Sequence, residues 1–158
     1  MSEEKPGIQE LRDELAIRDL VARYSEAVDR RDEKAWAETW AEDGIWNVGP
    51  SHATGREAVV KTWSGLMELF RFVTQMPQSG FIELDGNHAR GTWQVMELGW
   101  PHQGDPSCTL GVYDDRYRRT DAGWRFAERS FHFVYMGPPD LSGRLIGHPS
   151  SPLPAEEG

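Results

Sequence analysis

The spacing of apolar residues changes near Phe72, and this change constrains the fold more than any other feature of the chain. From Ile8 to Val28 apolar residues recur mostly every three or four positions, which predicts an amphipathic helix over about residues 8–30. After Phe72 the apolar period falls toward two and turn residues separate the runs, as is typical of strands. A chain whose helices precede its strands is expected to fold as an α+β domain.

Caps and turn residues divide the chain further. Asp32 is a suitable N-cap for a short second helix, on which Trp36 and Trp40 would form one i,i+4 pair until Asp43-Gly44 ends it. The other expected elements are a short strand at 45–48, a loop at 49–55, a third helix over about 56–70, and strands at about 71–78, 80–84, 88–100, 108–120 and 123–135. Because hairpin-type loops join the last three strands, we expect a strongly curved, mostly antiparallel sheet with one face on the helices.

The length of 158 residues corresponds to one domain. We divide the chain into an N-terminal extension at 1–7, the domain at 8–136, and a Pro-rich tail at 137–158 that is expected to wrap the surface or to be disordered at its end. The tail holds half of the ten prolines and has no apolar period. Cys108 is the single cysteine, so the chain has no internal disulfide framework.

Composition excludes several classes of partner. The net charge of −9 comes without a basic stripe, so nucleic acid is not an expected partner. The sequence has no long apolar run and no apolar stretch behind its charged start, so we expect no membrane span, no secretory signal and a cytoplasmic location. Seven Trp residues and 11% aromatic residues predict either a ring-filled core or a pocket for an apolar small molecule.

Familiar catalytic motifs are missing from the sequence. It has no phosphate-binding Gly-rich loop with its Lys, no Gly-x-Ser-x-Gly, no Cys-x-x-Cys and no His-Glu-x-x-His, so we expect neither a metal nor a cofactor. Of the five histidines only His132 falls inside a predicted strand, beside Phe131 and Phe133. His132 is equally a catalytic candidate and an edge or dimer-face residue.

Three stretches carry a family resemblance in their order and spacing. They are IRDLVARY at 17–24 running into AVDRRD at 27–32, TGREA at 54–58, and GVYDDRYRRT at 111–120 before GWRFAER at 123–129. The chain resembles the SnoaL-like branch of the NTF2-like superfamily over about residues 8–136. The resemblance implies a cone-shaped α+β barrel, with three N-terminal helices packed on a curved sheet around one deep pocket. The superfamily hosts several enzyme classes and non-enzymes, so fold alone does not fix function.

Within that branch the pattern is similar to the scytalone dehydratase and hexachlorocyclohexane dehydrochlorinase group, in which an Asp at the end of the first helix and a His in the sheet abstract a proton. The resemblance places Asp29 at the Asp position, although the helical period alone puts it about 120° from the Tyr24 stripe, toward solvent. It also implies that Arg129 stabilises negative charge on the substrate and that Trp46 and Phe70 line the pocket. Trp46 and Phe70 could instead be core residues, and Arg129 could instead be a salt-bridge partner on the sheet.

The position expected to hold the His of that pair is Gln75. An amide orients a carboxylate but accepts no proton near neutral pH. Three accounts stay open: Asp29 works with Arg129 alone, another residue such as His132 or Tyr24 replaces the His, or the pocket binds without catalysis. Gln75, Tyr113 and Phe131 complete the expected substrate-binding residues.

The leading hypothesis is a cofactor-independent lyase or isomerase. In it a carboxylate with a raised pKa removes a proton from an apolar cyclic or polyketide-like molecule, and elimination or a double-bond shift follows, as in a dehydratase. One alternative is a non-catalytic ligand-binding or accessory protein. An accessory subunit would fill the pocket space with side chains. Another is an epoxide hydrolase that uses Tyr113, Asp115 and Tyr117 on one strand face with Arg129. That chemistry needs a second inward Asp, and the sequence offers no clear candidate.

The resemblance also implies a homo-oligomer, either a dimer or a trimer, formed by packing sheets back to back. The strands at 88–100 and 108–120, with Trp93 or Trp100 among charged residues, are the expected contact. A monomer whose Pro-rich tail covers that surface is the alternative.

Overall fold

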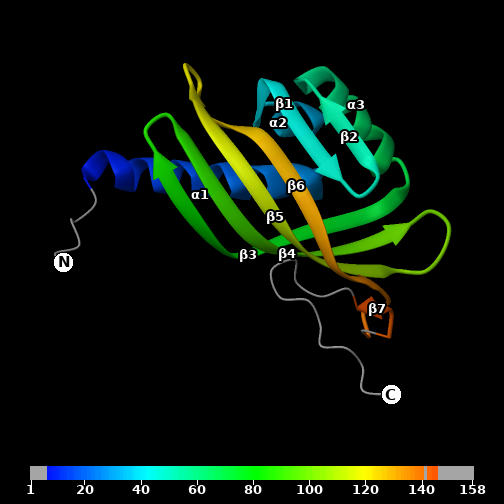
Figure 1. Cartoon of the computed structure of the whole chain (residues 1–158). Helices are drawn as coiled ribbons and strands as arrows, with labels where there is room; N and C mark the ends of the chain where they lie inside the picture. Colours follow the sequence, from blue (N-terminus) through cyan, green and yellow to red (C-terminus); the bar gives the residue numbers. More distant parts are fainter. Residues whose placement is uncertain (1–6, 141, 146–158) are drawn as a thin grey trace, which may run out of the picture.

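A long helix lies across a curved, open sheet in this α+β domain, with two shorter helices at one side (Figure 1). The computed structural model describes residues 7–140 and 142–145. The predicted extension and tail therefore fall largely outside the described residues. The elements are α1 (Ile8–Arg30), α2 (Glu33–Ala37), β1 (Trp40–Val48), β2 (Ser51–Thr54), α3 (Arg56–Met67), β3 (Phe70–Asp85), β4 (His88–Pro101), β5 (Ser107–Thr120), β6 (Gly123–Gly137) and β7 (Arg144–Leu145).

The first helix has the bounds that its apolar period predicts. Ile17, Val21 and Tyr24 are buried on the stripe that faces the sheet. The helix ends because Arg31 adopts a left-handed backbone conformation with φ of 55°. The Arg31 guanidinium then donates hydrogen bonds to the backbone carbonyls of Met67 and Phe70, which ties the end of α1 to the start of β3.

The second helix begins where it was predicted and ends earlier. The Asp32 carboxylate accepts a hydrogen bond from the Ala35 N–H at 2.9 Å and caps α2. Trp40 was expected on this helix, but it is the first residue of β1. Thr39 donates its hydroxyl hydrogen to the Trp36 carbonyl at 2.7 Å, and Trp40 pairs with Phe126 of β6, so pairing with the sheet replaces another helical turn.

Two further predictions at this edge were wrong. The segment 49–55 was expected to be a loop, but Ser51–Thr54 forms β2, which pairs antiparallel with β1 across a turn at Gly49. Gly49 has φ of +54°, a conformation that favours glycine and makes this tight turn possible. The third helix ends at Met67 instead of Phe70, because Phe70 already pairs with Pro101 of β4.

The strands form one sheet in the order β2-β1-β6-β5-β4-β3, with β7 paired to β6. All described neighbours are antiparallel except β1 and β6, which run parallel. The two predicted strands at 71–78 and 80–84 are a single strand, β3, interrupted by a shift in register between Pro77 and Gly80. Because β3 is an edge strand, Pro77 is tolerated there without loss of a ladder hydrogen bond on both sides.

The core lies between the concave face of the sheet and the helices, and aromatic rings dominate it. Either Trp93 or Trp100 was expected on the exposed face. Trp93 points inward and is buried, because it alternates in phase with Val95 along β4. Trp100 is 45% exposed, and the guanidinium carbon of Arg71 lies 3.9 Å from the centroid of its ring. In the part of the chain that the structure describes, no helix is long and apolar enough to cross a membrane.

Candidate active site

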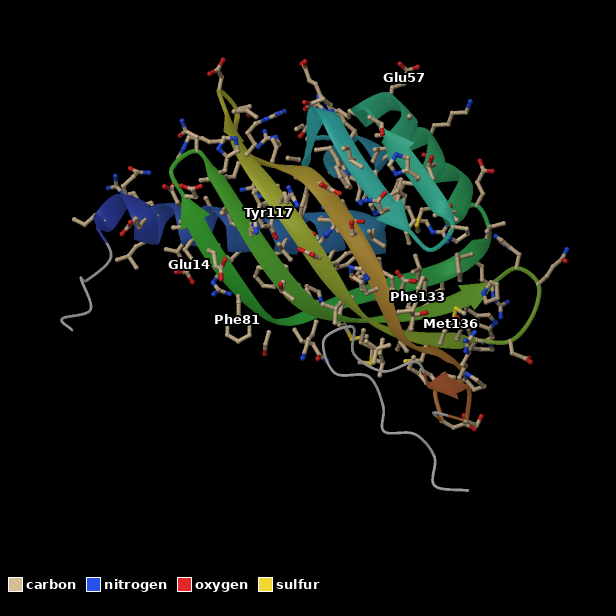
Figure 2. All side chains as sticks on the ribbon, in the orientation of Figure 1. Glu14, Glu57, Phe81, Tyr117, Phe133 and Met136 are labelled. Carbon is tan, nitrogen blue, oxygen red and sulfur yellow. The ribbon has the colours of Figure 1, made fainter. Side chains whose placement is uncertain are left out.

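A cavity of about 310 Å³ lies on the concave side of the sheet, between α1, α3 and the ends of the long strands. Its walls are mainly apolar, with a short polar segment where β3, β4 and β5 meet. The lining residues are Tyr24, Val28, Trp46, Val48, Trp63, Leu66, Met67, Phe70, Val73, Gln75, Val95, Glu97, Ser107, Thr109, Tyr113, Phe131, Phe133 and Met136. In Figure 2, Phe133 and Met136 lie near the far end of β6.

Packed rings hold the aromatic wall in place. Trp63 of α3 stacks on Trp36 with 4.7 Å between centroids, and Trp36 meets Trp46 edge-on at 5.4 Å. On the opposite side Phe131 meets Tyr113 edge-on at 5.0 Å. Such contacts add to the burial of each ring and fix its orientation, so the wall is preorganised for a flat or cyclic ligand.

All five predicted substrate-binding residues lie on this cavity, together with Tyr24. They are Trp46, Phe70, Tyr113, Phe131 and Gln75, and Gln75 forms part of the polar segment. Tyr24 and Tyr113 are buried, and burial raises the pKa of both phenols, so each keeps its proton. The structure thus brings together six residues that the sequence singled out.

The polar segment centres on Gln75 and Glu97, which are directly paired residues on β3 and β4. The Gln75 side-chain amide donates a hydrogen bond to Glu97 Oε2 at 2.7 Å and a longer one to the Tyr113 hydroxyl at 3.3 Å. Burial raises the pKa of the Glu97 carboxyl, the hydrogen bond from Gln75 opposes the rise, and the nearby Asp29 charge adds to it. The cavity therefore contains a carboxyl group whose pKa lies above the ordinary value for a glutamate.

Glu97 was not among the predicted site residues. The signal that could have found it is strand alternation, because Trp93, Val95 and Glu97 share one face of β4 and the first two are buried. A carboxylate in phase with buried apolar residues marks an inward-facing charge. Its pairing with Gln75 depends on the register of β3 against β4, which the sequence does not specify.

Asp29 lies outside the cavity lining, on the exposed side of the last turn of α1. Its Oδ1 accepts a hydrogen bond from the Gln75 backbone N–H at 2.8 Å, and its Oδ2 accepts one from the Thr74 hydroxyl at 3.0 Å. The helical period had pointed to this outward position, and the resemblance had pointed inward. Asp29 and Arg129 therefore do not face each other across the cavity.

Arg129 is fully buried behind the cavity wall. Its Nε and Nη2 donate to the two oxygens of Asp115 at 2.9 and 3.1 Å, and Tyr117 donates to the same carboxylate at 2.7 Å. The guanidinium carbon lies 3.6 Å from the ring centroid of Tyr113 and 4.3 Å from that of Tyr24. Burial disfavours the guanidinium charge, but Asp115 outweighs this and raises the pKa of Arg129 above its usual value. The two tyrosine rings separate Arg129 from the cavity.

His132 does not reach the cavity. It is exposed on β6, while its neighbours Phe131 and Phe133 both line the cavity from the other face of the strand. Strand alternation requires this, because successive side chains point to opposite faces. Within the described residues there is no group of three or more His, Cys, Asp or Glu side chains that could hold a metal ion.

The fold and the cavity define the class of this protein: an α+β domain whose curved, open sheet and helices border a largely apolar cavity. The family model for the SnoaL-like domain matches residues 9–130, so the chain belongs to the SnoaL-like domain family.

Individual relatives agree with this assignment. The chain is 28% identical over 138 residues to gamma-hexachlorocyclohexane dehydrochlorinase of Sphingobium indicum, covering 83% of this chain and 86% of that protein. Among solved structures, a scytalone dehydratase-like protein of Novosphingobium aromaticivorans has a TM-score of 0.78 at 22% identity, over 90% of this chain and 97% of that one. A crystal structure of LinA has a TM-score of 0.77 at 26% identity, over 88% and 96% of the two chains.

Proposed function

We propose that this protein is a cofactor-independent lyase or isomerase that removes a proton from a cyclic, mainly apolar small molecule in the cavity. The observation that carries the proposal is an apolar cavity, left open by the surrounding side chains, whose lining includes one carboxylate, Glu97, among the described residues. An accessory protein that used this fold for assembly alone would be expected to fill that space with side chains.

The size and the walls of the cavity support a cyclic substrate. Its 310 Å³ is about twice the volume of an apolar cavity that holds one benzene molecule, which suits one or two fused rings. Flat walls from Trp46, Trp63 and Phe131 would stack on such rings. The name of the Sphingobium indicum relative, a dehydrochlorinase of a chlorinated cyclohexane, agrees with a ring substrate and with elimination.

The polar segment supports the reaction type. Proton removal from carbon needs a base within reach of the C–H bond and hydrogen-bond donors for the negative charge that develops. Glu97 and Gln75 provide the carboxylate and an amide, and the Tyr113 and Tyr24 hydroxyls are candidate donors toward a substrate oxygen. We propose that Arg129 contributes indirectly, because its charge lies directly behind both tyrosine rings.

The test is conversion of a defined panel by the purified protein. The panel contains bicyclic β-hydroxy ketones and polychlorinated cyclohexanes, which lose water and hydrogen chloride, respectively, when a base removes a proton. We expect one class to give an unsaturated product, followed by ultraviolet absorbance and proton NMR. Binding without turnover, detected by quenching of tryptophan fluorescence, would favour the binding protein instead.

We also propose a homodimer or trimer. The exposed side chains Phe72, Phe81 and Trp100 on β3 and β4 are the apolar groups that such a contact would cover. Sedimentation velocity at several concentrations tests this, and a monomer throughout would contradict it.

A further inference from the structure

We propose that Glu97 is the base that takes the proton from the substrate and that Gln75 positions it, so that Glu97 does the work the resemblance assigns to Asp29. This inference rests on the proposed function and names the group that performs it. The argument depends on where three side chains lie: Glu97 on β4, Gln75 on β3 and Asp29 at the end of α1.

The carboxylate of Glu97 is the one that meets the cavity. Glu97 belongs to the lining, and among the described residues only Gln75 donates a hydrogen bond to it, through Oε2. Its other oxygen, Oε1, has no hydrogen-bond partner among those residues, and the side chain as a whole is half-buried. A carboxylate held at one oxygen and open at the other has the geometry that a general base requires.

The carboxylate of Asp29 is engaged elsewhere. Both of its oxygens accept hydrogen bonds from β3, one from the Gln75 backbone and one from the Thr74 hydroxyl. It is exposed and does not line the cavity. Through these contacts Asp29 connects the end of α1 to β3 and holds the backbone at Gln75 in place.

Gln75 connects the two carboxylates and decides which of them can act. Its backbone N–H holds Asp29 and its side-chain amide holds Glu97. An amide carries no titratable proton near neutral pH, so it cannot pass a proton from the cavity out to Asp29. The proton must therefore be taken by a group that reaches the cavity directly.

The proposed step balances without any further reagent. Glu97 Oε1 takes the proton from carbon, the electrons of the C–H bond become the new carbon–carbon π bond, and the leaving group departs with the electrons of its own bond. For a hydroxyl leaving group, the protonated Glu97 returns its proton and water leaves. For chloride, Glu97 loses its proton to solvent. In an isomerisation the proton returns to a different carbon.

The pH profile distinguishes the two carboxylates. Activity requires ionised Glu97, so it rises as pH climbs through the Glu97 pKa. Burial raises this pKa, the Gln75 hydrogen bond lowers it and the Asp29 charge raises it. Tyr113 and Tyr24, the other titratable groups on the cavity, remain protonated in this range, and Arg129 lies behind their rings.

The experiment compares four variants of the full chain on the panel compound that the wild type converts. Glu97→Gln should lower kcat by about a hundredfold or more while ligand binding, followed by tryptophan fluorescence, changes little. Gln75→Met removes the amide and should move the acid limb of the pH profile to higher pH. Asp29→Asn removes a negative charge and should move that limb to lower pH, with kcat reduced by less than about tenfold. Glu83→Gln, an exposed glutamate on β3, is the matched control and should leave the activity unchanged.

The outcomes separate the two proposals. Glu97 is supported as the base if Glu97→Gln loses about a hundredfold or more in kcat and the acid limb of the pH profile moves up in Gln75→Met and down in Asp29→Asn. An active wild type whose Glu97→Gln variant keeps more than about half its kcat overturns the base assignment and leaves the proposed function standing. Loss in Asp29→Asn with an active Glu97→Gln assigns the base to Asp29. A wild type that converts no panel compound overturns the proposed function, and the role of Glu97 with it.

Discussion

The concave face contains two inward-facing carboxylates, fully buried Asp115 and half-buried Glu97, whose surroundings differ. Asp115 accepts hydrogen bonds from Arg129 and Tyr117, and Tyr117 is in turn bonded by Trp93 at 2.8 Å. Rings fill the space around this network. Glu97 has Gln75 as its only described partner and borders an open cavity. In Figure 2, Tyr117 on β5 lies far from Phe133 and Met136, two residues of β6 that line the cavity.

This difference gives Asp115 a structural role and leaves Glu97 as a candidate for catalysis. Burial raises the pKa of the Asp115 carboxyl, and Arg129 and Tyr117 counteract part of the rise, so a counterion and a phenol satisfy this group in place. Burial also raises the pKa of Glu97, but only a neutral amide opposes it. Both oxygens of Asp115 accept hydrogen bonds from described residues, whereas Glu97 accepts one from them on Oε2 alone. The following variants test whether the surroundings of the two carboxylates differ as described.

The largest expected effect comes from breaking the buried ion pair. Arg129→Met leaves the Asp115 carboxylate buried without a counterion, which should cost about 3–5 kcal/mol in the free energy of unfolding. Urea denaturation at neutral pH measures it. The matched control is Arg116→Met, because Arg116 is exposed and lies 3.6 Å from Glu128, and we expect a loss below about 1 kcal/mol. Equal losses in the two variants would contradict the structural role of the pair.

A smaller effect is expected from adding one methyl group at each of two positions on β4, one beside Tyr117 and one beside the cavity. Gly91→Ala would place its Cβ 2.9 Å from the Tyr117 ring, so we expect a loss of about 1–3 kcal/mol. Val95→Ile adds a methyl group beside the cavity and should cost less than about 1 kcal/mol. Thermal unfolding compares the two. A larger loss in Val95→Ile would mean that the position beside the cavity is as tightly packed as the one beside Tyr117.

Changing each of the two carboxylates, Asp115 and Glu97, to the matching amide should give a sharper difference in the free energy of unfolding. Asp115→Asn removes the counterion of buried Arg129 and should destabilise the fold by about 3 kcal/mol or more. Glu97→Gln removes a half-buried charge that lacks a counterion among the described residues, so the free energy of unfolding should change by less than about 1 kcal/mol or rise. Urea denaturation of both variants at neutral pH is the measurement. A Glu97→Gln variant as unstable as Asp115→Asn would assign Glu97 a structural role.

The smallest effect concerns Asp13, a carboxylate on α1 paired with Arg119. The hydrogen bonds from Arg119 and Trp124 lower the pKa of Asp13 from 3.8 to about 2. Because the folded-state pKa is depressed, the stabilisation from Asp13 is present above pH 3.8 and is lost as pH falls toward 2. We therefore expect the melting temperature of Asp13→Asn to fall less than that of the wild type over this interval. Parallel curves would show that Asp13 contributes nothing to acid unfolding.

Much of the fold could be predicted from the sequence because its signals are local. The period of α1, the Asp32 cap of α2 and the hairpin turns all depend on neighbouring residues, and these elements lie where they were expected. The errors arose where pairing between distant strands decided the structure. Trp40 left the second helix to pair with Phe126, and the segment 49–55 folded back onto β1 as β2.

The candidate site was predictable to the same extent. Composition predicted many rings and the resemblance pointed to Trp46 and Phe70 among them; the structure places both of these, with Phe131, on the cavity lining. Glu97 was missed because its place beside Gln75 depends on the pairing of two strands, one of which shifts register at Pro77–Gly80. Asp29 was assigned inward by resemblance, although its helical phase favoured solvent.

The most direct test of the account is a crystal structure of the protein soaked with the bicyclic β-hydroxy ketones and polychlorinated cyclohexanes of the panel. The account predicts a ligand among Trp46, Trp63 and Phe131, with a C–H group facing Glu97 and a substrate oxygen or chlorine facing the tyrosines. A ligand whose reactive carbon faces Asp29, or a cavity that collapses and stays empty at saturating ligand, would contradict it.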